Sequence, residues 1–376
     1  MALTTLGLLA AGCGGASLAG AHLAAAGAPP GLATSLASAG GTSWAVVDMG
    51  GSSAARENFW QLFARPARSP AWRQATPAGV ADNGGLVVAA PGGTSLVTGF
   101  RPSHDLTFSP LAVTTDDGAH WATGTLVGHG LADLPGALAA GAAGRLIALT
   151  GDGEAQLGTR LGAVWTNLAS VASLARTGAG KACGLTGLTA VAFGAARSPL
   201  LGGRCARPGV PGLFALRGHV WLGGGPALPA PLARQDVGVL ALDTAGGRTG
   251  VVLLAGAGPA ASVLVATSSA RAGHWRLSPP LRVGRAGVTS VSFGAAGGVG
   301  LVLPGGHGEI LSGAGGRWDA LPALPAATAT LALGPAARVD ALAARGTTFT
   351  DWRLSPNAAW TQAQTLHVPI PYGSSS

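Results

Sequence analysis

Carboxylate side chains are scarce in this chain, which makes its few glutamates the first candidates for chemistry. The three glutamates are Glu57, Glu154 and Glu309, and Asp105 is a further candidate. Two carboxyl groups held ~5 to 10 Å apart can act as acid and base in the cleavage of a glycosidic bond. A glycan-active hydrolase or lyase is therefore one hypothesis, and it requires a fold that brings two of these groups together.

Other signatures of catalysis fail on their context. The segment Gly178–Ala182 resembles part of a phosphate loop, but Ala182 stands where a Ser or Thr would hold Mg²⁺. The chain has no Gly-x-Ser-x-Gly motif, and its eight histidines include no pair at metal-ligand spacing. The sequence therefore predicts neither a cofactor nor a metal, and it favours binding over catalysis.

The three cysteines fall into two groups. Cys183 and Cys205 are 22 residues apart in the middle of the chain, and a disulfide is the natural interpretation of an even pair in an exported protein. Two buried free thiols are the alternative. The third cysteine, Cys13, follows a short apolar run at residues 2–12.

This amino-terminal run resembles a bacterial lipoprotein signal, although no Lys or Arg precedes it. It is too short to span a bilayer, but it fits a secretory segment with small residues before the cysteine. The resemblance implies lipidation of Cys13 and anchoring to the outer face of the bacterial cytoplasmic membrane. An ordinary secretory signal or a disordered tail is the alternative.

A repeat of tryptophans indicates the scaffold that would position these residues. Seven of the ten tryptophans recur at intervals of 42 to 56 residues. These are Trp72, Trp121, Trp165, Trp221, Trp275, Trp318 and Trp360. One aromatic residue per unit at this spacing is typical of β-propeller blades, each of which must stack on its neighbours. We therefore predict an all-β fold, a seven-bladed β-propeller of four-stranded antiparallel blades.

Each unit contains four short apolar runs separated by glycine clusters, which we interpret as strands A to D, with the tryptophan opening strand D. The predicted order is a signal segment at 1–12, a flexible tether at 13–30, the propeller at 31–368 and a tail at 369–376. The innermost strand of the first unit is either residues 32–38 or the carboxy-terminal stretch 368–372. The first of these is favoured.

Charged and polar residues gather in the predicted connections between strands B and C. These residues are Arg56, Glu57, Arg101, His104, Asp105, Asp152, Glu154, Arg204, Arg207, His307, Glu309 and Arg345. All B–C connections of a propeller emerge on one face, and binding sites are commonly built on such loops. The sequence therefore predicts a ligand-binding B–C face, against the simpler interpretation that polar residues prefer loops.

The turn between strands C and D of the second unit carries a family resemblance. Thr114, Asp116, Gly118 and Trp121 fit the Asp-box, or bacterial neuraminidase repeat, and only its seventh position departs. In such a turn the aspartate accepts backbone N–H groups, the glycine takes positive φ and the tryptophan packs between blades. The chain thus resembles sialidase-like and photosystem-assembly-factor-like propellers, which implies a fold and not an activity.

A Tyr-dependent sialidase mechanism is disfavoured. Sialidases use a tyrosine nucleophile, and the single tyrosine of this chain, Tyr372, lies in the predicted tail. The formal charge of +8 does not favour a nucleic-acid partner, because the basic residues are scattered along the sequence. Together the features predict a monomeric, lipid-anchored scaffold outside the cytoplasm that binds a protein or a cell-envelope polymer.

Overall fold

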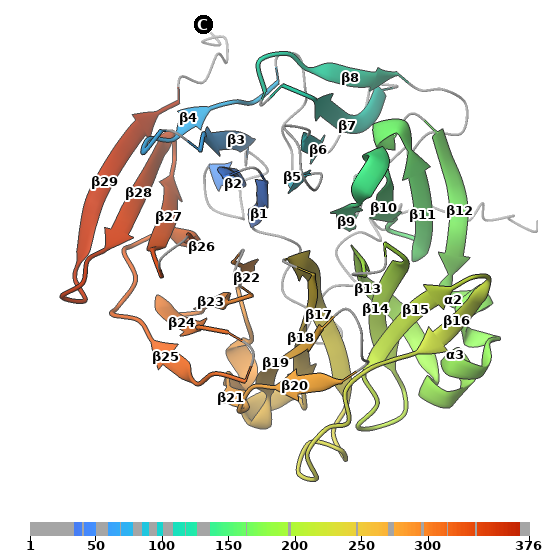
Figure 1. Ribbon diagram of the computed structural model, residues 1–376. Coiled ribbons are helices and arrows are strands. Elements are labelled where there is room, and N and C mark those ends of the chain that lie inside the picture. The colour runs from blue at the N-terminus through green and yellow to red at the C-terminus, as the bar shows by residue number, and fades with distance from the viewer. Residues whose placement is uncertain are drawn as a thin grey trace, which may run out of the picture.

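The computed structural model is a ring of antiparallel sheets around a central axis (Figure 1). It describes residues 34–39, 41–49, 59–67, 69–77, 85–89, 96–100, 108–116, 118–125, 136–162, 164–194, 197–245, 247–269, 274–294, 297–313, 315–334 and 337–368. The strands follow one another around the ring in sequence order. The predicted all-β propeller is confirmed.

Four-stranded antiparallel units repeat along the chain. The first three blades are β1 (Thr34–Ala39), β2 (Thr42–Met49), β3 (Phe59–Arg65) and β4 (Arg73–Gln74); β5 (Gly85–Ala89), β6 (Leu96–Phe100), β7 (Phe108–Thr114) and β8 (Ala122–Thr125); and β9 (Ala137–Ala140), β10 (Leu146–Leu149), β11 (Glu154–Thr159) and β12 (Val164–Ser170). The last two are β22 (Ser290–Phe293), β23 (Val299–Leu303), β24 (His307–Leu311) and β25 (Trp318–Ala320); and β26 (Thr328–Leu333), β27 (Val339–Arg345), β28 (Thr348–Leu354) and β29 (Trp360–His367).

Between these blades lies a nine-stranded sheet that contains two further units. Its strands are β13 (Leu185–Phe193), β14 (Pro199–Cys205), β15 (Gly212–Arg217), β16 (Val220–Gly223), β17 (Val237–Ala245), β18 (Arg248–Ala255), β19 (Ser262–Ser269), β20 (Trp275–Leu277) and β21 (Leu281–Arg282). The two units join through the pairing of Arg204 in β14 with Gly238 in β17. The expected count of seven blades depends on treating this sheet as two.

Helices are short in the described residues. They are α2 (Val171–Ala175), α3 (Gly178–Cys183) and the single 3₁₀ turns η1 (Ala142–Gly144), η2 (Arg160–Gly162), η3 (Gly258–Ala260) and η4 (Gly284–Ala286). Ser170 and Thr177 cap the two α-helices by accepting N–H groups of Ser173 and Gly180. None of the described helices is long and apolar enough to cross a membrane.

The repeated tryptophans lie at the start of the outermost strands, as predicted. Trp275, Trp318 and Trp360 open β20, β25 and β29, and the other four lie within one residue of a D strand. Trp72 and Trp165 are buried, as expected for side chains that pack between blades.

The first blade takes its innermost strand from the amino-terminal side, as favoured. Strand β1 pairs antiparallel with β2, from Thr34 opposite Val47 to Ala39 opposite Thr42. Of the alternative segment 368–372, the structure describes only Val368, which is buried and donates its N–H to the carbonyl of Thr347 at 2.8 Å.

The seam between the first and last blades is held by side chains, because the described strands of β1–β4 and β26–β29 form separate sheets. Phe63 stacks on Phe349 with ring centroids 4.0 Å apart, and Trp72 contacts Phe349 edge-on at 5.9 Å. The Gln364 amide accepts the N–H of Trp72 at 2.7 Å and donates to its carbonyl at 2.8 Å. Ring closure therefore depends on this packed interface.

Candidate binding faces

The structure places the described members of the predicted B–C site in four different blades. Asp152 and Glu154 lie at the β10–β11 turn, His307 opens β24, Glu309 lies in the middle of β24, and Arg345 ends β27. Arg204 is in β14 and Arg207 follows it closely. Arg56, Glu57, Arg101, His104 and Asp105 lie outside the described residues.

These described residues do not form one cluster. Asp152 is engaged within its own turn by the hydroxyl of Thr150. Burial raises the pKa of Glu309, and Asp319 raises it further, against the opposing effect of His307. Glu154 and Glu309 belong to different sheets, so the fold does not place these two glutamates in one blade.

A pocket opens on the B–C side between β22–β25 and β26–β29. Its lining is mainly small and apolar: Thr289, Val302, Leu303, Pro304, Gly305, Gly306, Leu324, Pro325, Ala326, Ala327 and Thr328. None of the predicted site residues lines it. The pocket therefore offers shape and backbone groups but no titratable side chain.

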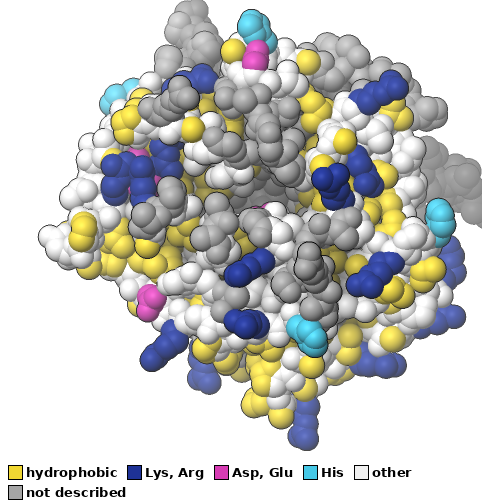
Figure 2. Space-filling model, viewed as in Figure 1, with side chains coloured by type: hydrophobic (Ala, Val, Ile, Leu, Met, Phe, Trp, Pro, Cys, Tyr) yellow, Lys and Arg dark blue, Asp and Glu magenta, His cyan; other side chains and the backbone are white. Residues whose placement is uncertain are grey.

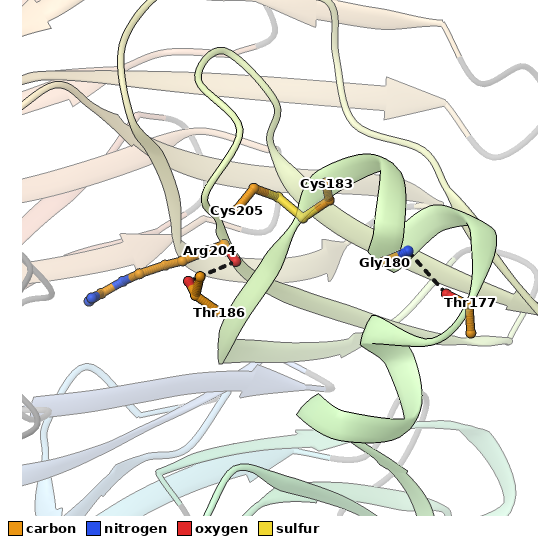
Figure 3. Close-up of a disulfide and its surroundings, with 6 residues drawn as sticks. All are labelled: Thr177, Gly180, Cys183, Thr186, Arg204 and Cys205. Atoms are coloured by element: carbon orange, nitrogen blue, oxygen red, sulfur yellow. Dashed lines mark hydrogen bonds between the residues drawn. A yellow bond between two sulfur atoms is a disulfide. The ribbon is translucent and has the colours of Figure 1, made fainter.

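The one disulfide of the described chain lies next to Arg204 (Figure 3). Cys183 at the end of α3 is bonded to Cys205 at the end of β14, which confirms the predicted pairing. The N–H of Arg207 donates to the carbonyl of Cys183 at 3.1 Å. The Arg204 side chain extends away from the disulfide, and burial lowers its pKa.

Removing this disulfide should destabilise the protein. Replacing Cys183 and Cys205 with serine should lower the free energy of unfolding by about 3 kcal/mol, because the crosslink no longer restricts the unfolded chain. Urea unfolding of the oxidised wild type and the double variant measures the difference. Dithiothreitol should destabilise the wild type by a similar amount and leave the variant unchanged. Equal stability of oxidised wild type and variant would contradict the prediction.

The residues predicted to form an Asp-box make a hydrogen-bonded hairpin between β7 and β8. Thr114 donates its hydroxyl to Asp116 at 2.8 Å and accepts the N–H of Gly118 at 2.9 Å. Asp116 accepts the N–H of His120 at 2.9 Å, and this bond with the His120 ring and the Thr114 hydroxyl holds the pKa of Asp116 well below its usual range. Gly118 has φ of +81° and approaches the indole of Trp44. Each of these hydrogen bonds joins residues within the turn, so this geometry accounts for a turn and not a ligand site.

The face opposite the B–C face carries arginines that were not predicted as site residues from the sequence. The turns between strands A and B repeat one geometry, in which the first residue donates its N–H to the carbonyl of the fifth. Gly141 donates to Arg145, Gly194 to Ser198 and Gly334 to Arg338, each at 2.8 Å. The Gly-Ala-Ala that starts the turns at 141 and 194, with arginine at 145 and 197, was the signal available in the sequence.

Arg145, Arg197 and Arg248 stand at the A–B turns of three blades, near the axis of the ring. Arg197 and Arg248 are exposed, whereas Arg145 is half-buried. Arg145 donates to the carbonyl of Arg197 at 3.3 Å and lies over the ring of Phe193 at 5.2 Å. Within the described part of the chain no carboxylate pairs with any of the three.

The C–D hairpins emerge on this same face, which we call the A–B face, because antiparallel strands place alternate connections together. They add exposed Arg160, Arg217 and Arg317. In Figure 2 basic side chains lie around the central opening, over β10 and over β27 and β28, and acidic side chains are sparse. The A–B face therefore presents a surplus of positive charge toward solvent.

Comparison with known proteins supports the fold. The sequence matches no protein-family model and no curated protein. YCF48 from Cyanidioschyzon merolae has a similar structure, with a TM-score of 0.52 and 13% identity over 88% of this chain and 98% of that chain. A Lactobacillus plantarum protein is similar with a TM-score of 0.55 and 11% identity over 86% and 96% of the two chains. The chain shares the β-propeller fold with both.

Proposed function

We propose that the protein is an exported, non-catalytic β-propeller that binds an acidic segment of a protein, or an acidic cell-envelope polymer, on its A–B face. The observation that carries this proposal is that three arginines at A–B turns, Arg145, Arg197 and Arg248, form no ion pair with a described carboxylate. Unpaired basic groups around a channel mouth attract and orient negatively charged ligands.

Export and anchoring belong to the same proposal. The Cys183–Cys205 disulfide is typical of an oxidising compartment, which supports secretion through the amino-terminal segment. Cys13 would carry the lipid and hold the ring at the outer surface of the cytoplasmic membrane. Metabolic labelling with a radioactive fatty acid tests this step, and a Cys13→Ser variant that retains the label would contradict it.

Binding to a labelled oligoglutamate peptide tests the choice of face. Replacing Arg145, Arg197 and Arg248 together with glutamine should weaken binding at least tenfold, because three charge-assisted contacts are lost. Fluorescence anisotropy at low and moderate salt measures the affinity. An oligoglutamine peptide controls for contacts that do not depend on charge.

The B–C face supplies the matched control. Replacing Arg204, Arg207 and Arg345 with glutamine removes the same charge from the opposite face and should change the affinity less than twofold. A larger loss in this variant than in the A–B variant would favour the B–C site predicted from the sequence. Equal affinities in all three proteins would exclude both faces.

A further inference from the structure

Three arginines converge on one buried carboxylate at the end of the seam that lies on the A–B face. Asp340, which is fully buried, pairs with Arg65 from β3. Arg338 reaches the same carboxylate at 2.8 Å, and Arg353 from β28 reaches it at 3.2 Å. Arg338 is the counterpart, in the last blade, of the A–B turn arginines described above. The seam therefore ends in a cluster of guanidinium groups on the A–B face.

A second buried carboxylate adjoins this cluster, and few polar partners offset the cost of burying its charge. Asp351 is fully buried, neither of its oxygens has a hydrogen-bond partner, and Arg353 comes no closer than 4.0 Å. Burial raises its pKa to about 6, and Asp340 adds to this effect while Arg65, Arg353 and Arg338 oppose it. Opposite Asp351 on β29 is the neutral Gln364.

The surplus positive charge of the cluster lies on its exposed side. Three guanidinium groups face two carboxylates, so one positive charge remains when Asp351 is ionised and two remain when it is protonated. The Arg338 and Arg353 side chains are 29% and 36% exposed, whereas Arg65 is 8% exposed. Asp340 engages only part of the donor capacity of these guanidinium groups, which have five N–H donors each.

We propose that the exposed ends of Arg338 and Arg353 bind an oxyanion, and that binding is stronger when Asp351 carries a proton. Asp351 acts as an internal counter-charge that weakens the site when it is ionised. An oxyanion suits the planar fork of arginine, which bonds carboxylate, sulfate and phosphate groups. In the cell the ligand is an acidic side chain of the partner, a step that rests on the proposed function; the ion site itself does not.

The pH dependence follows from the charge of the cluster. As pH falls from 7.5 to 5, Asp351 passes through its pKa of about 6 and becomes neutral, while the arginines stay charged. Sulfate keeps its two negative charges over this range. We therefore expect sulfate to bind about fivefold to tenfold more tightly at pH 5 than at pH 7.5, the effect of one charge several ångströms away in partly screened surroundings.

Sulfate titration of the full chain, followed by NMR of the arginine side-chain N–H groups, tests the site. Asp351→Asn should bind sulfate at pH 7.5 as tightly as the wild type does at pH 5, and its affinity should not vary with pH. Arg353→Gln should lose most of the binding, and Arg317→Gln, an exposed arginine of the preceding blade, should lose none. Chloride at matched ionic strength controls for screening.

Three outcomes would overturn the proposal: sulfate affinity that does not depend on pH in the wild type, unchanged affinity in Arg353→Gln, or weaker binding in Asp351→Asn. Since Arg353→Gln removes a partner of Asp340 and can unfold the seam, Asp351→Asn provides the independent test. A protein that binds oligoglutamate but not sulfate would refute this site and leave the proposed function in place. The reverse result would refute the proposed function alone.

Discussion

Asp340→Ala should lower the free energy of unfolding by about 3 to 5 kcal/mol, because removing one partner of a buried ion pair leaves uncompensated charge. The uncompensated charge would be mainly that of Arg65, because its side chain is only 8% exposed and pairs with Asp340 across the seam. Arg65 also lies over the ring of Trp72, with its guanidinium carbon 4.8 Å from the ring centroid. Urea unfolding at pH 7 measures the loss.

Two variants isolate the cause of this effect. Asp319→Ala removes an exposed carboxylate and should change stability by less than about 0.5 kcal/mol. Replacing Asp340 with leucine and Arg65 with methionine together removes both members of the pair and should recover part of the loss. A double variant less stable than Asp340→Ala would mean that the pair does not act through uncompensated charge.

Phe349→Ala should cost about 3 to 5 kcal/mol, the usual range for truncating a buried phenylalanine. Phe349 is fully buried and contacts both Phe63 and Trp72 of the first blade. Because no described strand is shared across the seam, the loss should also loosen this one interface. Hydrogen exchange in β3 and β28, measured by mass spectrometry, should accelerate relative to β18 and β19.

The matched control is Phe214→Ala, which truncates another buried phenylalanine, in β15 away from the seam. It should cost a similar free energy of unfolding while leaving the relative exchange of β3 and β28 unchanged. Equal acceleration in every blade of both variants would show that the ring opens as a whole and that the seam is not its weakest interface.

The fold was predictable because its signals are local and repeated. Short apolar runs between glycines mark the strands, and one tryptophan per unit marks each outer strand, so Trp275 and Trp318 could be assigned without knowledge of their neighbours. The same holds for Cys183 and Cys205, since an even pair within one hairpin has one partner choice.

The seam cluster could not be predicted in this way. Arg65 and Asp340 are 275 residues apart, and only closure of the ring brings them together. Each looks like an ordinary charged residue at the end or start of a strand. The pairing depends on which face of β3 and β27 is turned toward the neighbouring blade. The alternation of side chains along a strand does not determine that face until the strand register is known.

The predicted B–C site illustrates a different limit. A predicted loop position indicates a side of the ring, but it does not show whether residues of different blades converge, and Glu309 and Arg204 lie within strands. Glu154 and Glu309 share a side and remain in separate sheets. The A–B arginines were overlooked for the opposite reason, because a turn rich in glycine and alanine, such as Gly141–Arg145, resembles plain scaffold.

The separate sheets at the two ends of the chain have an evolutionary consequence. Here β1–β4 and β26–β29 are each built from one continuous segment. Duplication or loss of such a segment adds or removes a whole blade without leaving a strand unpaired, so the size of the ring is open to change by recombination at the links between blades.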